Sequence, residues 1–282
     1  MPTIEVEPGI HLAYQDRGTG RPIVFVHGWA GSGDCWDYQV LDLASSYRCI
    51  TVDLRGHGAS DKPWGVYDYD LFVKDLHTLI IELDLLDVTL VGWSMGGHIG
   101  LKYAHEHPER IGHLVITGSG PRFWQAPNAL FGTPADDVSD LIEAVRVAHT
   151  ETIAGVYANN FHRTDLKATE KLFVQTGWKV PTFVGLTSFQ ALVDVDLRDQ
   201  LPTVRVPVAI FSGRHDQIWD PRWSEEAQRL LPNATLTYFE NSGHVAFIEN
   251  REEWNAALID VIEGRAPEVS LGTNTQAVKE TV

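Results

Sequence analysis

The sequence has few cysteines, an excess of acidic over basic residues, and no long apolar run. Only Cys35 and Cys49 occur among 282 residues, which is too few for a disulfide framework, so we expect both thiols to be reduced. Lysine and arginine number 22 against 38 acidic residues, a net charge of −16. Nucleic-acid phosphates and anionic lipid surfaces would repel such a chain. No run approaches the ~18 apolar residues of a membrane span. We therefore expect neither nucleic-acid nor membrane binding.

Other patterns are also missing. The body of the chain contains no internal repeat, no H-E-x-x-H histidine spacing and no G-x-G-x-x-G after a strand, so we expect no metal and no organic cofactor. The N-terminus lacks the basic and apolar regions of a secretory signal, so we expect a cytoplasmic protein unless a signal has been removed. The composition, 44% hydrophobic and 21% charged, is that of a globular domain. The oligomeric state stays open, a homo-oligomer included.

Apolar, β-rich runs alternate with helical patterns along most of the chain. The expected strands are 11–16, 23–26, 48–52, 88–93, 112–117, 208–212 and 235–239, and the expected helices between them are 34–44, 70–85, 95–107, 221–231 and 245–262. Several strands are continuous apolar runs, as is typical of strands covered on both faces. The pattern predicts an α/β fold with a mostly parallel, doubly wound sheet.

The alternation stops between residues 121 and 203. This stretch is rich in aromatic residues and shows helical periodicity at 137–149, 152–161, 166–176 and 183–192. We interpret it as a helical cap inserted into a core formed by residues 1–120 and 204–263. The tail, 264–282, loses apolar periodicity and is expected to be disordered.

The most informative motif is Gly92-Trp93-Ser94-Met95-Gly96. It follows an apolar strand and precedes a helical pattern, the strand–turn–helix setting in which G-x-S-x-G presents a serine nucleophile. The serine must occupy a strained turn, and glycines remove side chains that would collide there. The motif predicts Ser94 as a nucleophile.

A serine hydroxyl needs a base, and the base needs an orienting acid. In this architecture the acid and then the histidine follow the serine in the chain. His244 follows the last expected strand, and Asp216 follows the strand before it. Asp220 is a second candidate acid, although a role at the start of a helix before Pro221 explains it better.

The tetrahedral intermediate needs two N–H donors for its oxyanion. We expect one from Met95, which follows the serine at the start of a helix. The other is expected from Trp29, in the segment His27-Gly28-Trp29-Ala30-Gly31 after an early strand. His27 and Gly28 are then interpreted as residues that shape this loop.

Five motifs occur together in one order: 26–29, 53–61, 92–97, 213–216 and 242–244. In this arrangement the chain resembles the α/β-hydrolase superfamily, and within it the serine esterases and cofactor-free haloperoxidases with a helical cap. The resemblance implies the triad Ser94, Asp216 and His244 with the donors Trp29 and Met95, in agreement with the reading from the residues. It also implies that 53–61 forms a structural turn. Many haloperoxidase-like members carry proline after the Trp29 position, where this chain has Ala30, which favours ester hydrolysis over perhydrolysis.

The sequence thus predicts a carboxylic-ester hydrolase that acts through an acyl-enzyme on a small to medium apolar ester or lactone. Candidate substrate-binding residues are aromatic or apolar and lie in the expected cap or beside the catalytic motifs: Trp93, Phe123, Trp124, Phe131, Phe161, Trp219 and Val245. A lactonase, a C–C bond hydrolase or a perhydrolase could use the same triad. A ligand receptor on a hydrolase fold is the alternative from another class.

Overall fold

The computed structural model describes residues 1–126 and 131–265. Within them, eight strands form one sheet in the order β1-β2-β4-β3-β5-β6-β7-β8. The strands are β1 (Thr3–Glu7), β2 (Ile10–Arg17), β3 (Pro22–Val26), β4 (Arg48–Val52), β5 (Val88–Trp93), β6 (Ile111–Thr117), β7 (Val208–Gly213) and β8 (Ala234–Phe239). The pairs β1–β2 and β2–β4 are antiparallel and all other pairs are parallel. The predicted mostly parallel sheet is confirmed.

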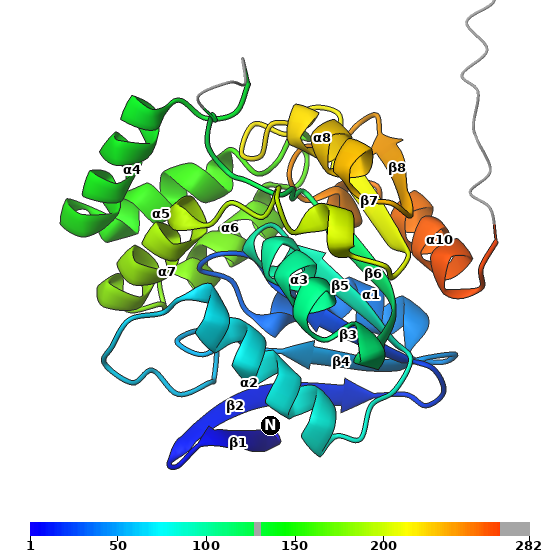
Figure 1. Ribbon diagram of the computed structural model, residues 1–282. Helices are drawn as coiled ribbons and strands as arrows, with labels where there is room; N and C mark the ends of the chain where they lie inside the picture. The colour runs from blue at the N-terminus through cyan, green and yellow to red at the C-terminus, as the bar shows by residue number, and fades with distance from the viewer. Residues whose placement is uncertain (127–130, 266–282) are drawn as a thin grey trace, which may run out of the picture.

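Helices cover both faces of the sheet (Figure 1). On one face lie α2 (Tyr69–Glu82), α3 (Met95–Glu106) and α8 (Arg222–Leu230), and on the other lie α1 (Asp37–Leu43) and α10 (Arg251–Ile262). Every residue of β5 and of β7 is buried, because helices shield these central strands on both sides. The continuous apolar runs of these strands therefore reflect their position in the sheet.

The interruption between 121 and 203 is helical, as predicted. Helices α4 (Ala135–Val147), α5 (His149–Ala158), α6 (Lys167–Gly177) and α7 (Thr182–Asp194) all fall between β6 and β7. These four helices, called the inserted helices below, gather beyond the edge of the sheet where the parallel strands end (Figure 1). In an open parallel sheet this edge is where ligands bind.

Three local predictions differ from the structure. The strand β1 was not predicted, because it is a short edge strand with only Val6 buried. The expected helix at 34–44 is a 3-10 turn, Gly33–Trp36, followed by α1. The expected helix at 245–262 is broken into α9 (Ala246–Glu249) and α10. The break falls at Asn250, whose side chain accepts a hydrogen bond from the Ser242 hydroxyl and donates one to Glu253.

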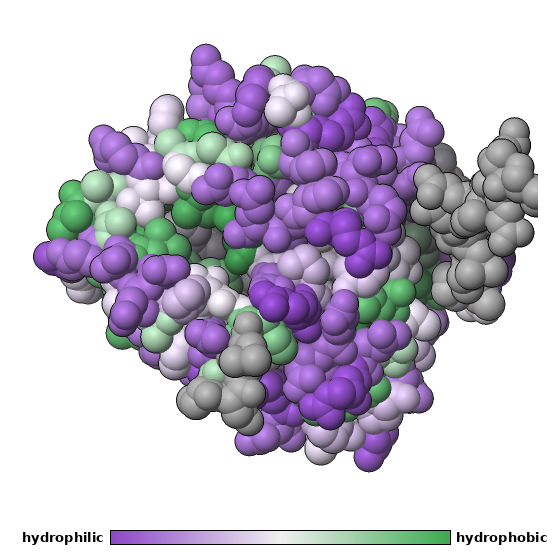
Figure 2. Space-filling view, turned by 90° about the horizontal axis from the view of Figure 1, so that it is seen from above, coloured by the Kyte–Doolittle hydropathy of each residue, from purple (hydrophilic) through white to green (hydrophobic). Residues whose placement is uncertain are grey.

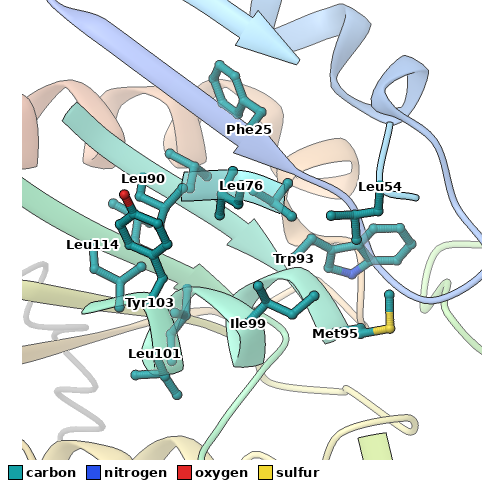
Figure 3. Packing of buried hydrophobic residues seen from close by; sticks show 14 of the residues in the cluster. Phe25, Leu54, Leu76, Leu90, Trp93, Met95, Ile99, Leu101, Tyr103 and Leu114 are labelled. Atoms are coloured by element: carbon teal, nitrogen blue, oxygen red, sulfur yellow. The ribbon is translucent and has the colours of Figure 1, made fainter. Parts of the chain in front are cut away.

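The core between the sheet and α3 is apolar and closely packed. Figure 3 shows Leu90 of β5 and Ile99 of α3 in this layer, with Trp93 and Met95 at its end beside Leu54. All five side chains are at most 1% exposed. The layer therefore fixes β5 and α3 on either side of residue 94.

Both cysteines are free thiols, as predicted. Burial raises the pKa of Cys49 to about 12. In the described part of the chain, no helix combines the length and the apolar character that crossing a membrane would require. Of the tail expected to be disordered, only Gly264 and Arg265 are described, and the remainder, 266–282, lies outside the described residues.

Candidate active site

Ser94 occupies a strained turn between β5 and α3. Its φ of 54° and ψ of −119° lie in a region that L-residues rarely adopt. The turn is held from both sides, since the Ser94 N–H donates to the Thr117 carbonyl at 3.0 Å and its carbonyl accepts from the Ser119 hydroxyl at 2.8 Å. The surrounding structure thus maintains a backbone conformation that would otherwise relax.

Neighbouring glycines permit this turn because other backbone atoms pass very close to them. A Cβ on Gly92 would lie 2.3 Å from the Gly96 carbonyl oxygen, and a Cβ on Gly96 would lie 2.4 Å from the Val26 oxygen. Both contacts are with backbone, which cannot move aside. The predicted reason for the glycines of the motif therefore agrees with the packing.

His244 and Asp216 are in direct contact. The Nδ1 atom of His244 lies 2.8 Å from Oδ2 of Asp216, and both side chains are almost fully buried. Because an ionised carboxylate only accepts hydrogen bonds, Nδ1 is the donor to such a partner. The histidine backbone is also fixed, since its N–H donates to Asn160 at 2.8 Å and its carbonyl accepts from the Trp93 indole at 3.0 Å.

Asp216 is oriented by its own loop. Its other oxygen, Oδ1, accepts hydrogen bonds from the backbone N–H groups of Ile218 at 2.8 Å and Trp219 at 2.9 Å. These two bonds leave Oδ2 for the imidazole. The carboxylate is thus held in one orientation relative to His244.

The second candidate acid, Asp220, is used elsewhere. Its carboxylate accepts from the Arg222 backbone N–H at 3.0 Å and pairs with the Arg222 guanidinium at 2.6 Å. It also accepts from the Gly132 N–H at 3.1 Å, which links α8 to the segment that precedes the inserted helices. This contact pattern matches the helix-start role expected for Asp220.

The loop after β3 lies against Ser94. A Cβ on Gly28 would be 3.0 Å from the Ser94 Cβ, so only glycine allows this approach without displacement. The ring of His27 spans the loop, with Nδ1 2.7 Å from the Gly28 oxygen and Nε2 accepting from the Leu54 N–H at 3.0 Å. Burial lowers the pKa of His27 to about 4, so the ring is neutral. His27 and Gly28 shape the loop, as predicted.

Trp29 is hydrogen-bonded to the inserted helices through its indole and through its backbone carbonyl. Its indole donates to the Gly185 carbonyl of α7 at 2.9 Å, and its carbonyl accepts from the Tyr157 hydroxyl of α5 at 3.1 Å. Met95 is the first residue of α3, so its N–H has no acceptor within that helix. The two predicted oxyanion donors therefore both belong to segments that border Ser94.

A cavity of about 140 Å³ brings these elements together. Ser94 and His244 lie in its wall, and most of the wall is apolar. Among the described residues, the lining consists of Trp29, Trp93, Ser94, Phe123, Thr133, Leu141, Val156, Tyr157, Asn160, Phe189, Leu192, Gln217, Ile218 and His244. Of the predicted substrate-binding residues, Trp93 and Phe123 are in this wall. Seen from above, the surface is mostly hydrophilic, and apolar residues gather on the side of the inserted helices (Figure 2).

Five predicted binding residues do not line the cavity, and this corrects the sequence interpretation. Trp219 is 1% exposed and packs with its ring centroid 5.5 Å from His98 and 5.4 Å from Phe123, behind the wall. Val245 is completely buried beside His244. Both are core residues next to the site.

The other three have partners away from the cavity, two within the inserted segment and one on α8. The Trp124 indole donates to the Val193 carbonyl at 2.9 Å. The Phe131 ring packs 4.6 Å from Trp223, and the Phe161 ring packs 5.7 Å from Phe173. The number of aromatic residues could identify the segment but could not distinguish residues of the cavity wall from these packing residues.

The sequence did not point to most of the wall, including Tyr157 and Asn160. Asn160 is 2% exposed, and its side-chain oxygen has no hydrogen-bond partner among the described residues. Tyr157 and Asn160 lie at the end of α5, so a helical pattern ending near a loop was the only available signal. Which residues of the inserted helices face Ser94 depends on how those helices pack.

The remaining histidines have other partners. His98 is fully buried between the Tyr69 hydroxyl at 3.2 Å and the Pro121 carbonyl at 3.0 Å, and burial lowers its pKa to about 4. His57 contacts the Arg55 carbonyl at 3.0 Å. In residues 1–126 and 131–265, no three His, Cys, Asp or Glu side chains are grouped so as to hold a metal ion.

Comparison with known proteins identifies the family. The sequence model of the α/β hydrolase fold matches residues 21–251. The chain belongs to the α/β-hydrolase family.

Relatives in this family are named as a hydrolase superfamily protein, a chloroperoxidase and an esterase. The AB hydrolase superfamily protein YisY of Bacillus subtilis is 33% identical over 90% of this chain and 96% of its own. The non-heme chloroperoxidase CPO-A1 of Kitasatospora aureofaciens is 31% identical over 93% of this chain and 99% of its own. Among solved structures, the esterase EaEST from Exiguobacterium antarcticum matches with a TM-score of 0.89 and 32% identity over 93% of this chain and 98% of that one.

Proposed function

We propose that this hydrolase cleaves carboxylic esters or lactones through an acyl-enzyme on Ser94. The observation that carries the proposal is the Asp216–His244 contact of 2.8 Å in a cavity whose wall also contains Ser94. An imidazole oriented by a carboxylate, in one cavity wall with a strained serine, is the set of groups that activates a hydroxyl. The similarity to an esterase over 93% of the chain supports the same reaction type.

The proposed reaction has two steps. His244 takes the Ser94 proton while the serine oxygen attacks the ester carbonyl, and the backbone N–H groups of Trp29 and Met95 bind the oxyanion. The protonated imidazole then donates to the leaving alcohol. In the second step His244 activates water, which releases the acid and regenerates Ser94. Asp216 orients the imidazole and stabilises its positive charge.

The inserted helices are proposed to act as a cap on a core of 1–120 and 204–263. Tyr157, Asn160, Phe189 and Leu192 of this segment form part of the cavity wall. The mainly apolar lining suits a small to medium uncharged ester or lactone.

A second candidate is perhydrolysis, because the chloroperoxidase relative is 31% identical. The loop beside Ser94 favours ester hydrolysis instead. Ala30 has a φ of 55°, whereas proline is fixed near −65°. A proline at this position therefore requires a different backbone path for the loop that supplies the Trp29 N–H.

A substrate panel with the Ser94→Ala variant tests the proposal. The wild-type protein should hydrolyse p-nitrophenyl esters or lactones, and the variant should lose about 10⁴-fold or more in kcat. Turnover of vinylogous diketones or peracid formation in place of ester cleavage would favour the related reactions. Ester hydrolysis that survives in Ser94→Ala would refute the assigned nucleophile, and negligible turnover of every substrate by the wild type would favour a receptor.

A further inference from the structure

A second cavity lies next to the first. It has a volume of about 160 Å³, and Trp93 and Tyr157 line both cavities. At this shared wall the second cavity is apolar, because the Phe173 ring lies 5.8 Å from Trp93 and 6.0 Å from Tyr157. The exposed side chains of Leu172, Asp34, Asp37 and Lys179 also line it. We call it the rear chamber. The predicted nucleophile, Ser94, lines only the first cavity.

The wall between the cavities is held rigidly. The Tyr157 ring is 1% exposed and lies 6.0 Å from Phe173, and its hydroxyl donates to the Trp29 carbonyl at 3.1 Å. Helix α6 packs tightly behind it, since a Cβ on Gly177 would lie 2.8 Å from the ring. The Trp93 indole is likewise bonded to the His244 carbonyl at 3.0 Å. Neither ring can leave the wall without breaking its hydrogen bond.

We propose that Tyr157 sets the upper size limit of the substrate by closing the rear chamber to it. This inference rests on the proposed ester hydrolysis. An apolar cavity of about 150 Å³ admits a benzene molecule, so the first cavity accepts an apolar substituent of about six carbon atoms. A longer chain meets the Tyr157 ring. Without that ring, the same chain enters the apolar part of the rear chamber.

Tyr157 is the better residue to mutate because Trp93 also contacts the proposed base. The indole of Trp93 fixes the backbone of His244, so its replacement would disturb the proposed base as well as the wall. The Tyr157 hydroxyl is bonded to Trp29 instead, and Tyr157→Phe removes that bond while keeping the ring. The effects of the ring and of the hydroxyl can therefore be separated.

The experiment measures kcat/KM for p-nitrophenyl esters from acetate to decanoate. For the wild type, kcat/KM should fall for acyl chains longer than about six carbons. In Tyr157→Ala it should continue to rise, by about fourfold for each methylene that becomes buried. In Tyr157→Phe, kcat/KM for the decanoate divided by kcat/KM for the butyrate should stay at the wild-type value, whatever the overall rate. An equal ratio in Tyr157→Ala and wild type would overturn the proposal.

A second variant and a binding measurement keep the proposal testable if Tyr157→Ala folds poorly or no ester is hydrolysed. Tyr157→Leu removes the ring but keeps an apolar side chain, and it should shift the ratio in the same direction if Tyr157→Ala folds poorly. Binding of linear alcohols from butanol to decanol to Ser94→Ala, measured by calorimetry, needs no turnover. Affinity should level off with chain length in Ser94→Ala and keep rising when Tyr157→Ala is added. If the affinities behave in this way but the wild type hydrolyses no ester, the proposed function is refuted and the role of Tyr157 as a barrier is not. If affinity levels off at the same chain length in both proteins, the role of Tyr157 as a barrier is refuted.

Discussion

The replacement Asp216→Asn is the sharpest test of how the site is oriented. The two oxygens of Asp216 have different partners, with Oδ1 accepting from the N–H groups of Ile218 and Trp219 and Oδ2 facing Nδ1 of His244. An asparagine can preserve the two loop bonds only if its oxygen faces them. Its NH₂ group then points at Nδ1, which must become an acceptor. The proton moves to Nε2, and His244 can no longer take the Ser94 proton.

The opposite amide orientation is disfavoured by the same contacts. It would place the NH₂ group against two N–H donors and leave them unpaired, at a cost of about 1–3 kcal/mol for each buried group. The wrong tautomer should therefore dominate, and kcat should fall by about 10⁴-fold, as for the equivalent change in a serine protease. Because the loop bonds survive, the melting temperature should change little.

The assay is kcat for a p-nitrophenyl ester together with thermal unfolding of both proteins. Asp220→Asn is the matched control, because Asp220 bonds to Arg222 and Gly132 and not to the imidazole. This control should lower the melting temperature and leave kcat close to the wild-type value. A fall of less than about tenfold in Asp216→Asn, or a larger loss of kcat in Asp220→Asn, would refute this account of the acid.

Three other predictions follow from single contacts. Ser94→Gly should be inactive yet about 1 kcal/mol more stable to urea than Ser94→Ala, because glycine relieves a φ of 54°; equal stabilities would argue against strain. Gly28→Ala should lower kcat by about 10²-fold with the fold intact, because its Cβ would press on Ser94 at 3.0 Å; wild-type kcat would show that the loop adapts. Burial holds the pKa of His98 at about 4, so the unfolded chain binds the extra proton as pH falls from 6.5 towards 4, and stability falls with it. Between pH 7 and pH 5 the free energy of unfolding of His98→Gln, measured by urea titration, should therefore fall less than that of the wild type, by on the order of 1–2 kcal/mol. An equal fall in both proteins would contradict a buried neutral ring.

The sheet and the position of the motifs could be predicted because their signals are local. The apolar run 88–93 and the glycines around Ser94 predict a buried strand, a tight turn and a helix without reference to the rest of the chain. The order of Asp216 and His244 after Ser94 places them on loops of the same sheet edge. The structure brings these two into contact at 2.8 Å.

Other features depended on specific pairing partners that hydrophobic periodicity does not reveal. Strand β1 exists because β2 pairs with it, with Ile4 opposite Leu12, and its own residues carry little apolar signal. The break before α10 arises from the Asn250 contacts with Ser242 and Glu253. Neither partner can be recognised from helical periodicity alone.

By itself the sequence determined the fold class, the inserted helical segment and the candidate nucleophile, base and acid, because each of these depends on a short pattern and on chain order. Only the tertiary structure decided which aromatic side chains face Ser94. Phe123 lines the cavity, whereas Trp124 bonds to Val193 of α7 and Phe131 packs on Trp223, although all three are aromatic and lie within nine residues of one another. A side chain's direction is set by the packing of helices against the core, and composition carries no information about that packing.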